Sequence, residues 1–168
     1  MCLQVWLEGL DTQLKTFDVF RLPYSNASRN FIDRKYPGRI TFYKGKSADT
    51  VPRYLSDVHA GRQPRCDLWF VDGDHSHGMP LTDLRNALEC ASDGATIIAD
   101  DCTRRFAAVQ AAWRATLLTG AISHEFNHTM ALPPPSGLKG WCVGRYHPHR
   151  MDSAATSIAS LRNRGGAR

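Results

Sequence analysis

Two apolar segments decide the fold of this chain: Asp67-Leu68-Trp69-Phe70-Val71-Asp72 and Gly94-Ala95-Thr96-Ile97-Ile98-Ala99-Asp100. Neither shows the polar–apolar alternation of a strand with one face in water, and each ends on a carboxylate. Strands buried on both faces have this pattern, and they belong to parallel sheets that are covered by helices. The two segments therefore predict a parallel sheet whose strands end in acidic residues.

Strand and helix patterns alternate on both sides of these segments. Ser25 is expected to cap the helix at 25–36, which Pro37-Gly38 stops. The weaker strand candidates are 14–18 and 39–44, and the expected helices are 25–36, 48–60, 79–91 and 104–118. This β-α order predicts a doubly wound α/β sheet, in which ligands bind at the carboxyl edge of the strands.

The pattern changes after Gly120. Residues 122–130 alternate polar and apolar side chains, and 140–146 form a partner strand, so an antiparallel hairpin is expected to close the sheet. The segment His124-Glu125-Phe126-Asn127-His128 spells the H-E-x-x-H zinc motif, which needs a helix to bring both histidines to one face. In a strand the two histidines lie about 13 Å apart, so the alternation argues against a zinc protease.

Composition describes an ordinary soluble protein of one domain with a tail. Apolar residues make up 42% and charged residues 22% of the 168 residues, and no apolar stretch approaches the roughly 20 residues that cross a bilayer. The five cysteines, without a Cys-x-x-Cys pair, indicate free thiols in a reducing cytoplasm. The net charge is +5, but basic residues are not interleaved with aromatic ones, so no nucleic-acid partner is expected.

Carboxylates converge at the expected sheet edge. Asp72 ends one buried strand, and Asp100 and Asp101 end the next. Carboxylates this close repel one another unless a cation neutralises them, and oxygen ligands favour a hard cation such as Mg²⁺, Mn²⁺ or Ca²⁺. His75 follows on the loop and can accept a proton from a hydroxyl. The alternative is structural, because aspartates also end strands as helix caps or turn formers.

Two further acidic patterns carry weaker predictions. Asp18 ends an earlier strand, where an acid can accept hydrogen bonds from both hydroxyls of a ribose, although a turn role is equally compatible. Asp72-Gly73-Asp74 matches the D-x-D of metal-dependent glycosyltransferases, which stays open as an enzyme of another class.

The segment Phe70-Val71-Asp72-Gly73-Asp74-His75-Ser76, followed by the Asp100-Asp101 doublet, resembles class I S-adenosylmethionine-dependent methyltransferases. It is most similar to the metal-dependent O-methyltransferase branch with the phrase F-I-D-G-D-H-S, which includes cephalosporin- and macrolide-tailoring enzymes. The resemblance extends over roughly residues 3–147 and includes 36–47 and 140–146. It implies a Rossmann-like, mostly parallel sheet with a C-terminal antiparallel hairpin.

The resemblance also implies roles for individual residues. Asp72, Asp100 and Asp101 match metal ligands, and His75 matches the general base. Residues that match cofactor contacts are Asp18 at the ribose, Ser47 on the adenine side, and Asp72. The implied cofactors are S-adenosylmethionine and Mg²⁺ or another hard divalent cation. The implied partner is a small-molecule hydroxyl acceptor, with no membrane and with a homo-oligomer as a possibility.

Two departures from the family's pattern stand beside these matches. Lys46 occupies a position where that branch usually has an acid. Strand one and the glycine-rich loop have no counterpart, so residues 1–149 are expected to form a partial domain that starts in its first helix, followed by a basic, disordered tail at 150–168. A truncated, non-catalytic binding protein of the same type is therefore the main alternative function.

Overall fold

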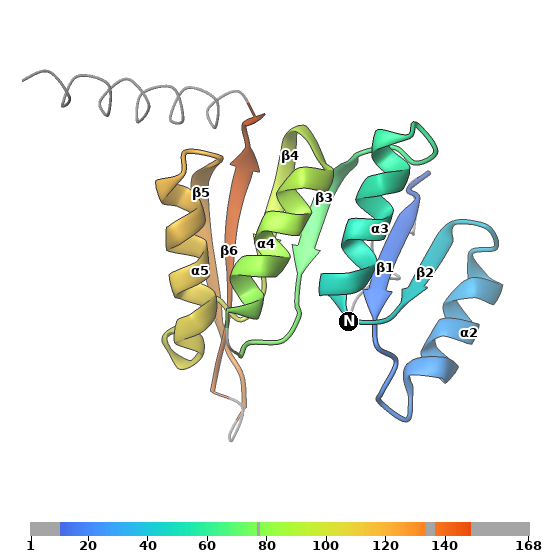
Figure 1. Ribbon diagram of the computed structural model, residues 1–168. Helices are drawn as coiled ribbons and strands as arrows, with labels where there is room; N and C mark the ends of the chain where they lie inside the picture. Colours follow the sequence, from blue (N-terminus) through green and yellow to red (C-terminus); the bar gives the residue numbers. More distant parts are fainter. Residues whose placement is uncertain (1–10, 77, 134–136, 149–168) are drawn as a thin grey trace, which may run out of the picture. The chain divides into compact units, whose positions relative to one another are not determined.

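The structure, a computed structural model, describes residues 11–76, 78–133 and 137–148 (Figure 1). The helix expected near the N-terminus and the tail expected at 150–168 lie outside these residues. The chain divides into two compact units, Met1–Arg53 and Tyr54–Arg168, and each is described by itself.

The first unit is built on two parallel strands, β1 (Leu14–Asp18) and β2 (Ile40–Lys44). Between them in the chain lies α2 (Ser25–Lys35), which contributes the buried Ile32. The small core consists of five side chains, Ile32, Ile40, Leu14, Tyr36 and Phe42. The prediction that Ser25 caps the helix is wrong, because α2 begins at Ser25 itself and its capping residue, Tyr24, makes no side-chain cap hydrogen bond. The helix α3 (Ser47–His59) follows β2 in the chain.

The second unit contains a four-stranded sheet with the order β3-β4-β6-β5 (Figure 1). The strand β3 (Cys66–Val71) runs parallel to β4 (Ala91–Ala99). The hairpin of β5 (Ile122–Ala131) and β6 (Leu138–Tyr146) adds to this pair through an antiparallel contact between β6 and β4. The α/β sheet with an antiparallel C-terminal hairpin is thus confirmed.

Two helices pack in the second unit. The helix α4 (Met79–Cys90) lies against β3 and β4, and α5 (Ala107–Leu118) lies against α4 and β5. A 3₁₀ turn, η1 (Arg104–Phe106), precedes α5, so the predicted helix at 104–118 begins in this tighter form. The side chains that these helices bury include Leu84, Leu88, Val109 and Trp113, which recur at helical spacing, and Ile97 of β4 is buried as well.

The strand β3 is more exposed than its apolar pattern predicted. Leu68 is 44% exposed, and within the strand only Trp69 is buried. The physical reason is its place in the sheet: β3 pairs with β4 along one edge, and no other strand among the described residues pairs with its second edge. An edge strand has fewer neighbours to cover its side chains than a central strand has.

The prediction of five free thiols is wrong for two cysteines. Cys102 and Cys142 form a disulfide with a Cα–Cα distance of 5.6 Å, across 40 residues of sequence. Their proximity follows from the register of β4 and β6, in which Ala99 lies opposite Cys142, and sequence spacing does not reveal it. Cys66 and Cys90 form no disulfide among the described residues, and burial raises the pKa of the Cys90 thiol to about 12.

Candidate functional site

The carboxyl ends of β3 and β4 lie side by side, as the sequence predicted. Val71 is opposite Ala99 in the parallel register, and the amide of Asp100 donates to the carbonyl of Val71 at 2.9 Å. Asp72 and the Asp100-Asp101 doublet therefore leave the sheet at the same edge, one step beyond the last paired residues.

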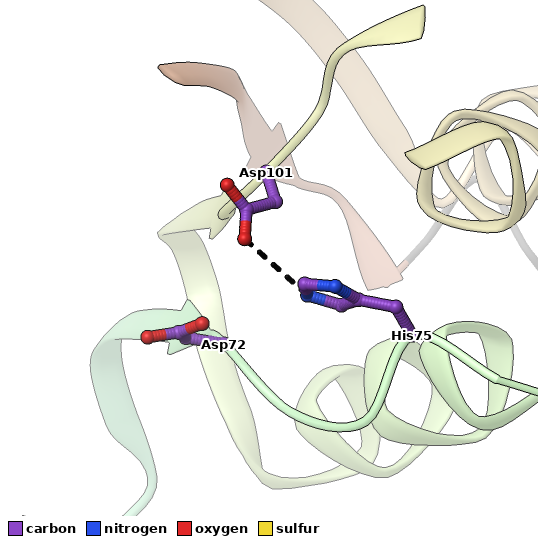
Figure 2. A group of neighbouring side chains, drawn as sticks. All are labelled: Asp72, His75 and Asp101. Atoms are coloured by element: carbon purple, nitrogen blue, oxygen red, sulfur yellow. Dashed lines mark ion pairs between the residues drawn. The ribbon is translucent and has the colours of Figure 1, made fainter. Parts of the chain in front are cut away.

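Three of the predicted site residues form a tight cluster (Figure 2). Asp72, His75 and Asp101 each offer a ligand atom, and these atoms lie within 4.8 Å of one another. The His75 Nε2 atom is 3.6 Å from Asp101 Oδ2, and the imidazole ring packs edge-on against Phe106 with ring centroids 4.6 Å apart. Figure 2 shows His75 on the loop that leaves β3, pointing toward Asp101 on the loop that leaves β4. Among the described residues, the group close enough to hold a metal ion thus contains His75, which was predicted as the base, and does not include the predicted ligand Asp100.

Lys139, near the start of β6, contacts two of the aspartates at this sheet edge. Its Nζ atom lies 2.6 Å from Asp100 Oδ2 and 2.9 Å from Asp101 Oδ1. Burial lowers the pKa of this ammonium group, but hydrogen bonds to Asp100 and Asp101 outweigh that effect and hold the pKa above its usual value. Lys139 was not predicted from the sequence, because its relation to the doublet depends on the register of β6 against β4. The only signal was a basic residue just before the strand predicted at 140–146.

One buried carboxylate oxygen next to this cluster accepts no hydrogen bond from the described residues. Asp100 is 3% exposed, and its Oδ1 atom is buried without a hydrogen-bond partner among the described residues. The carboxyl group of Asp72 is partly desolvated, and this desolvation, together with the negative charge of Asp100, raises its pKa to about 6. Crowded carboxylates with an open buried oxygen form a donor set that suits a hard divalent cation.

The loop after β3 is shaped by its own short-range contacts. A side chain at Gly73 would collide with the carboxylate of Asp83, a buried residue of α4. The Oδ1 atom of Asp74 accepts the amide of Ser76 at 2.9 Å, which closes a turn. The loop therefore passes close to α4 and returns toward the sheet edge with His75 at its centre. In the Asp72-Gly73-Asp74 pattern, the second aspartate has this turn-forming role.

The first unit gathers the two other predicted cofactor contacts at its own sheet edge. Asp18 ends β1, and its carbonyl accepts the amide of Gly45 at 3.0 Å just before α3 begins at Ser47. The Asp18 Oδ1 atom also accepts the amide of Phe20 at 2.8 Å, so the turn role considered for this residue is real. A cavity of about 510 Å³ lies beside Asp18 and is lined among others by Phe20 and Phe42.

The H-E-x-x-H segment lies in a strand, as predicted. His124 is opposite Gly144, and His128 is opposite Trp141, in the pairing of β5 with β6. The Trp113 indole donates to His124 Nδ1 at 3.3 Å, and the ring of His128 stacks on Trp141. Both histidines thus have structural contacts, and the helical arrangement that a zinc protease requires is absent from this segment.

Comparison with known families and structures agrees with this architecture. The sequence matches the family described as "Methyltransferase domain" over residues 1–102. A proposed O-methyltransferase from Klebsiella pneumoniae has a TM-score of 0.61 and 20% identity, with 80% of this chain and 62% of that chain covered. The O-methyltransferase TomG from Streptomyces achromogenes, involved in tomaymycin synthesis and solved with S-adenosylmethionine, has a TM-score of 0.62, 15% identity and coverages of 80% and 62%.

A third similar structure is an O-methyltransferase from Bacillus cereus in complex with S-adenosylhomocysteine. It has a TM-score of 0.60 and 13% identity, with 85% of this chain and 78% of that chain covered. At these identities the likeness concerns the fold. The chain spans 62% of the length of the Klebsiella and Streptomyces proteins.

Two further observations are negative. A search of curated proteins finds no match for this sequence. No helix in the described part of the chain combines the length and the apolar character of a membrane span.

The family match covers more than half of the 168 residues, and the fold is the α/β methyltransferase fold, so the chain belongs to the methyltransferase domain family.

Proposed function

We propose that the chain acts as an S-adenosylmethionine-dependent O-methyltransferase on a hydroxyl group of a small molecule. The observation that carries the proposal is the convergence of Asp72, His75 and Asp101 within 4.8 Å at the carboxyl edge of two parallel strands. Ligands of doubly wound sheets bind at this edge. Two similar folds, from Streptomyces achromogenes and Bacillus cereus, were solved with S-adenosylmethionine and S-adenosylhomocysteine.

A divalent cation, Mg²⁺ or a similar hard ion, is proposed to bind Asp72, Asp100 and Asp101. The support is the open, buried Oδ1 atom of Asp100 and the raised pKa of Asp72, since both reflect negative charge that the protein leaves incompletely compensated. When bound, such a cation lowers the pKa of a hydroxyl that it coordinates.

His75 is proposed as the general base. A proton on Nε2 faces Asp101 Oδ2 at 3.6 Å, and this orientation leaves Nδ1 as the nitrogen that accepts the proton of the acceptor hydroxyl. The edge-on contact with Phe106 restricts rotation of the ring. Because methyl transfer depends mainly on alignment, a fixed base beside a fixed acceptor is the main contribution that these residues can make.

Asp18 and Ser47 are proposed to bind the nucleoside end of S-adenosylmethionine. The Asp18 carboxylate has a second oxygen besides the one that accepts the Phe20 amide, and this oxygen can accept a further hydrogen bond. The adjoining cavity has aromatic walls from Phe20 and Phe42. A ribose needs an acceptor for its hydroxyls and an adenine needs apolar surface. Lys46, next to Ser47, stands at a position where the similar branch usually has an acid. The contacts to adenine are therefore proposed to differ from those in that branch.

Calorimetric titration with S-adenosylhomocysteine, with and without Mg²⁺, tests the proposal directly. We expect saturable binding, and tighter binding of a hydroxyl acceptor when Mg²⁺ is present. His75→Ala should lower methyl-transfer turnover by roughly 10²–10⁴ while the affinity for Mn²⁺ remains near that of the wild type. A complete loss of Mn²⁺ binding in His75→Ala would instead identify His75 as a ligand, and absence of cofactor binding would refute the proposed enzyme.

A further inference from the structure

Lys139 occupies one side of the acidic cluster with a charge that belongs to the chain itself. Its ammonium group contacts Asp100 Oδ2 at 2.6 Å and Asp101 Oδ1 at 2.9 Å. The Asp100 side chain is 3% exposed and that of Lys139 is 28% exposed. Ion pairs on an open surface contribute little, but this one joins a buried carboxylate, whose charge needs a partner.

The backbone around Lys139 fixes this contact. The strand β6 continues past the end of β4, and the carbonyl of Gly140 accepts the amide of Cys102 at 2.8 Å. A methyl group at Gly140 would lie 2.6 Å from the Thr103 side chain, so the two segments approach as closely as a glycine permits. The disulfide between Cys102 and Cys142 joins the same two segments. Lys139 is therefore held next to the doublet by the contacts that Gly140 and Cys142, the residues that follow it in β6, make with Cys102.

The charges of the cluster show what this lysine does to a cation site. Three ionised carboxylates and one ammonium group leave two negative charges for a divalent ion, and Lys139 already uses one oxygen of Asp100 and one of Asp101. Of the other two oxygens, Asp100 Oδ1 is buried without a hydrogen-bond partner among the described residues, and Asp101 Oδ2 lies 3.6 Å from His75 Nε2. A fixed positive charge at this distance repels an incoming cation and competes for the same carboxylates.

We infer that Lys139 is a tethered counter-cation, which neutralises the Asp100-Asp101 doublet when no metal is bound and weakens the affinity of the cluster for a divalent cation. The inference rests on the proposed function, because it takes the same carboxylates as the metal ligands. It gives the chain a built-in control over metal affinity that the acidic motif alone does not contain.

Titration of the whole chain with Mn²⁺ at one neutral pH, followed by calorimetry and by the electron paramagnetic resonance of free Mn²⁺, tests the inference. Lys139→Met removes the charge and keeps the length of the side chain, and we expect it to bind Mn²⁺ about tenfold or more tightly than the wild type. Lys139→Arg keeps the charge and should stay within about threefold of the wild type. Where the methionine variant does not fold, Lys139→Gln takes its place.

Arg145→Met is the matched control. Arg145 lies near the far end of the same strand, pairs with Glu125, and carries the same charge, so its loss tests for an effect of net charge alone. Equal Mn²⁺ affinity in Lys139→Met and wild type, or an equal gain in Arg145→Met, overturns the inference and leaves the proposed metal site standing. Absence of Mn²⁺ binding in all variants overturns the metal site as well, whereas binding of S-adenosylhomocysteine then reports on the cofactor site separately.

Discussion

Asp101 adopts a left-handed backbone conformation, with φ of 54°. Asp and Asn tolerate this region better than other residues with a side chain, because their short polar groups bond locally. Asp101→Asn therefore keeps the backbone and removes the charge. We expect the thermal stabilisation that Mg²⁺ gives to the wild type to disappear in this variant.

Asp101→Ala provides the comparison for that experiment. It should lose the same Mg²⁺-dependent stabilisation and should in addition be about 1 kcal/mol less stable without metal, because alanine is strained at this φ. Thermal unfolding with Mg²⁺ and with a chelator measures both effects. Undiminished stabilisation by Mg²⁺ in Asp101→Asn would exclude Asp101 from the ligand set.

Asp72 gives the cluster a defined pH dependence. Its pKa is raised from 3.8 to about 6 by desolvation and by Asp100, so the folded state binds a proton more tightly than the unfolded state. Without metal, the ionisation of Asp72 therefore lowers the free energy of unfolding as the pH rises from 3.8 to about 6. Denaturant titrations across this window should show that loss in the wild type relative to Asp72→Asn.

A saturating divalent cation should reverse this sign, because the cation binds the ionised carboxylate and its stabilising effect therefore grows as the pH rises. The same denaturant titrations with Mg²⁺ measure the reversal. Wild type and Asp72→Asn curves that run parallel under both conditions would show that Asp72 is not coupled to the site.

At the scale of single residues, the sequence predicted which carboxylates end β3 and β4 at one sheet edge, but not the lysine that contacts two of them. Asp72 and the Asp100-Asp101 doublet were placed at this edge because they follow the apolar strands β3 and β4 in the chain. Lys139 was not, because it reaches the doublet through the pairing of β6 with β4. The register of an antiparallel pair is set by packing and turns, which a single sequence specifies weakly.

At the scale of elements, the disulfide joins β6 to the loop after β4. It closes a loop across a sequence separation of 40 residues, for which the loss of chain entropy in the unfolded state corresponds to about 2–4 kcal/mol of stability. Cys142→Ser should therefore lower the free energy of unfolding by about this amount under oxidising conditions. A thiol reductant should destabilise the wild type in the same way.

The variant itself supplies the control for that prediction. Reductant should leave the unfolding of Cys142→Ser unchanged, and mass spectrometry of unreduced peptides should identify the link between Cys102 and Cys142. Free thiols at both positions in protein prepared without reductant would contradict the disulfide and would restore the prediction of free cysteines.

Element types were predictable where the periodicity of apolar residues was long and regular. The hairpin of β5 and β6 followed from its alternation, and α4 and α5 followed from their helical stripes of buried leucine, valine and tryptophan. The burial of β3 was overestimated, because composition describes what a strand can bury and not how many neighbours it has in the sheet. The 3₁₀ start of α5 likewise depends on local packing.

At the scale of the whole molecule, the family match covers the acidic residues of the candidate site but not the lysine that contacts them. The match ends at Cys102, so it includes Asp72, Asp100 and Asp101, whereas Lys139 and Cys142 lie beyond it. The order of strands and helices was predictable from the alternation of patterns along the chain. The grouping of the strands into sheets of two and four was not, because it depends on which edges find partners.

The proposed ligands are divided between the two compact units: Asp18 and Ser47 belong to the first, and the acidic cluster belongs to the second. This division predicts that cofactor affinity and metal affinity can be altered separately. Asp18→Asn keeps an oxygen for the amide of Phe20 and removes the carboxylate charge. We expect it to weaken S-adenosylhomocysteine binding by roughly 10- to 100-fold, the usual effect of losing hydrogen bonds to a charged group.

The affinity of Asp18→Asn for Mn²⁺ should remain that of the wild type, whereas Asp101→Asn should lose Mn²⁺ affinity and keep its affinity for S-adenosylhomocysteine measured without metal. Calorimetric titration of both variants with both ligands gives four affinities. Each variant should lose affinity for one ligand only, and the ligand should differ between the two variants. If Asp18→Asn bound the cofactor like the wild type, Asp18 would be left with its turn to Phe20 as its role. If either variant lost both ligands together, the expected separation of cofactor affinity from metal affinity would be wrong.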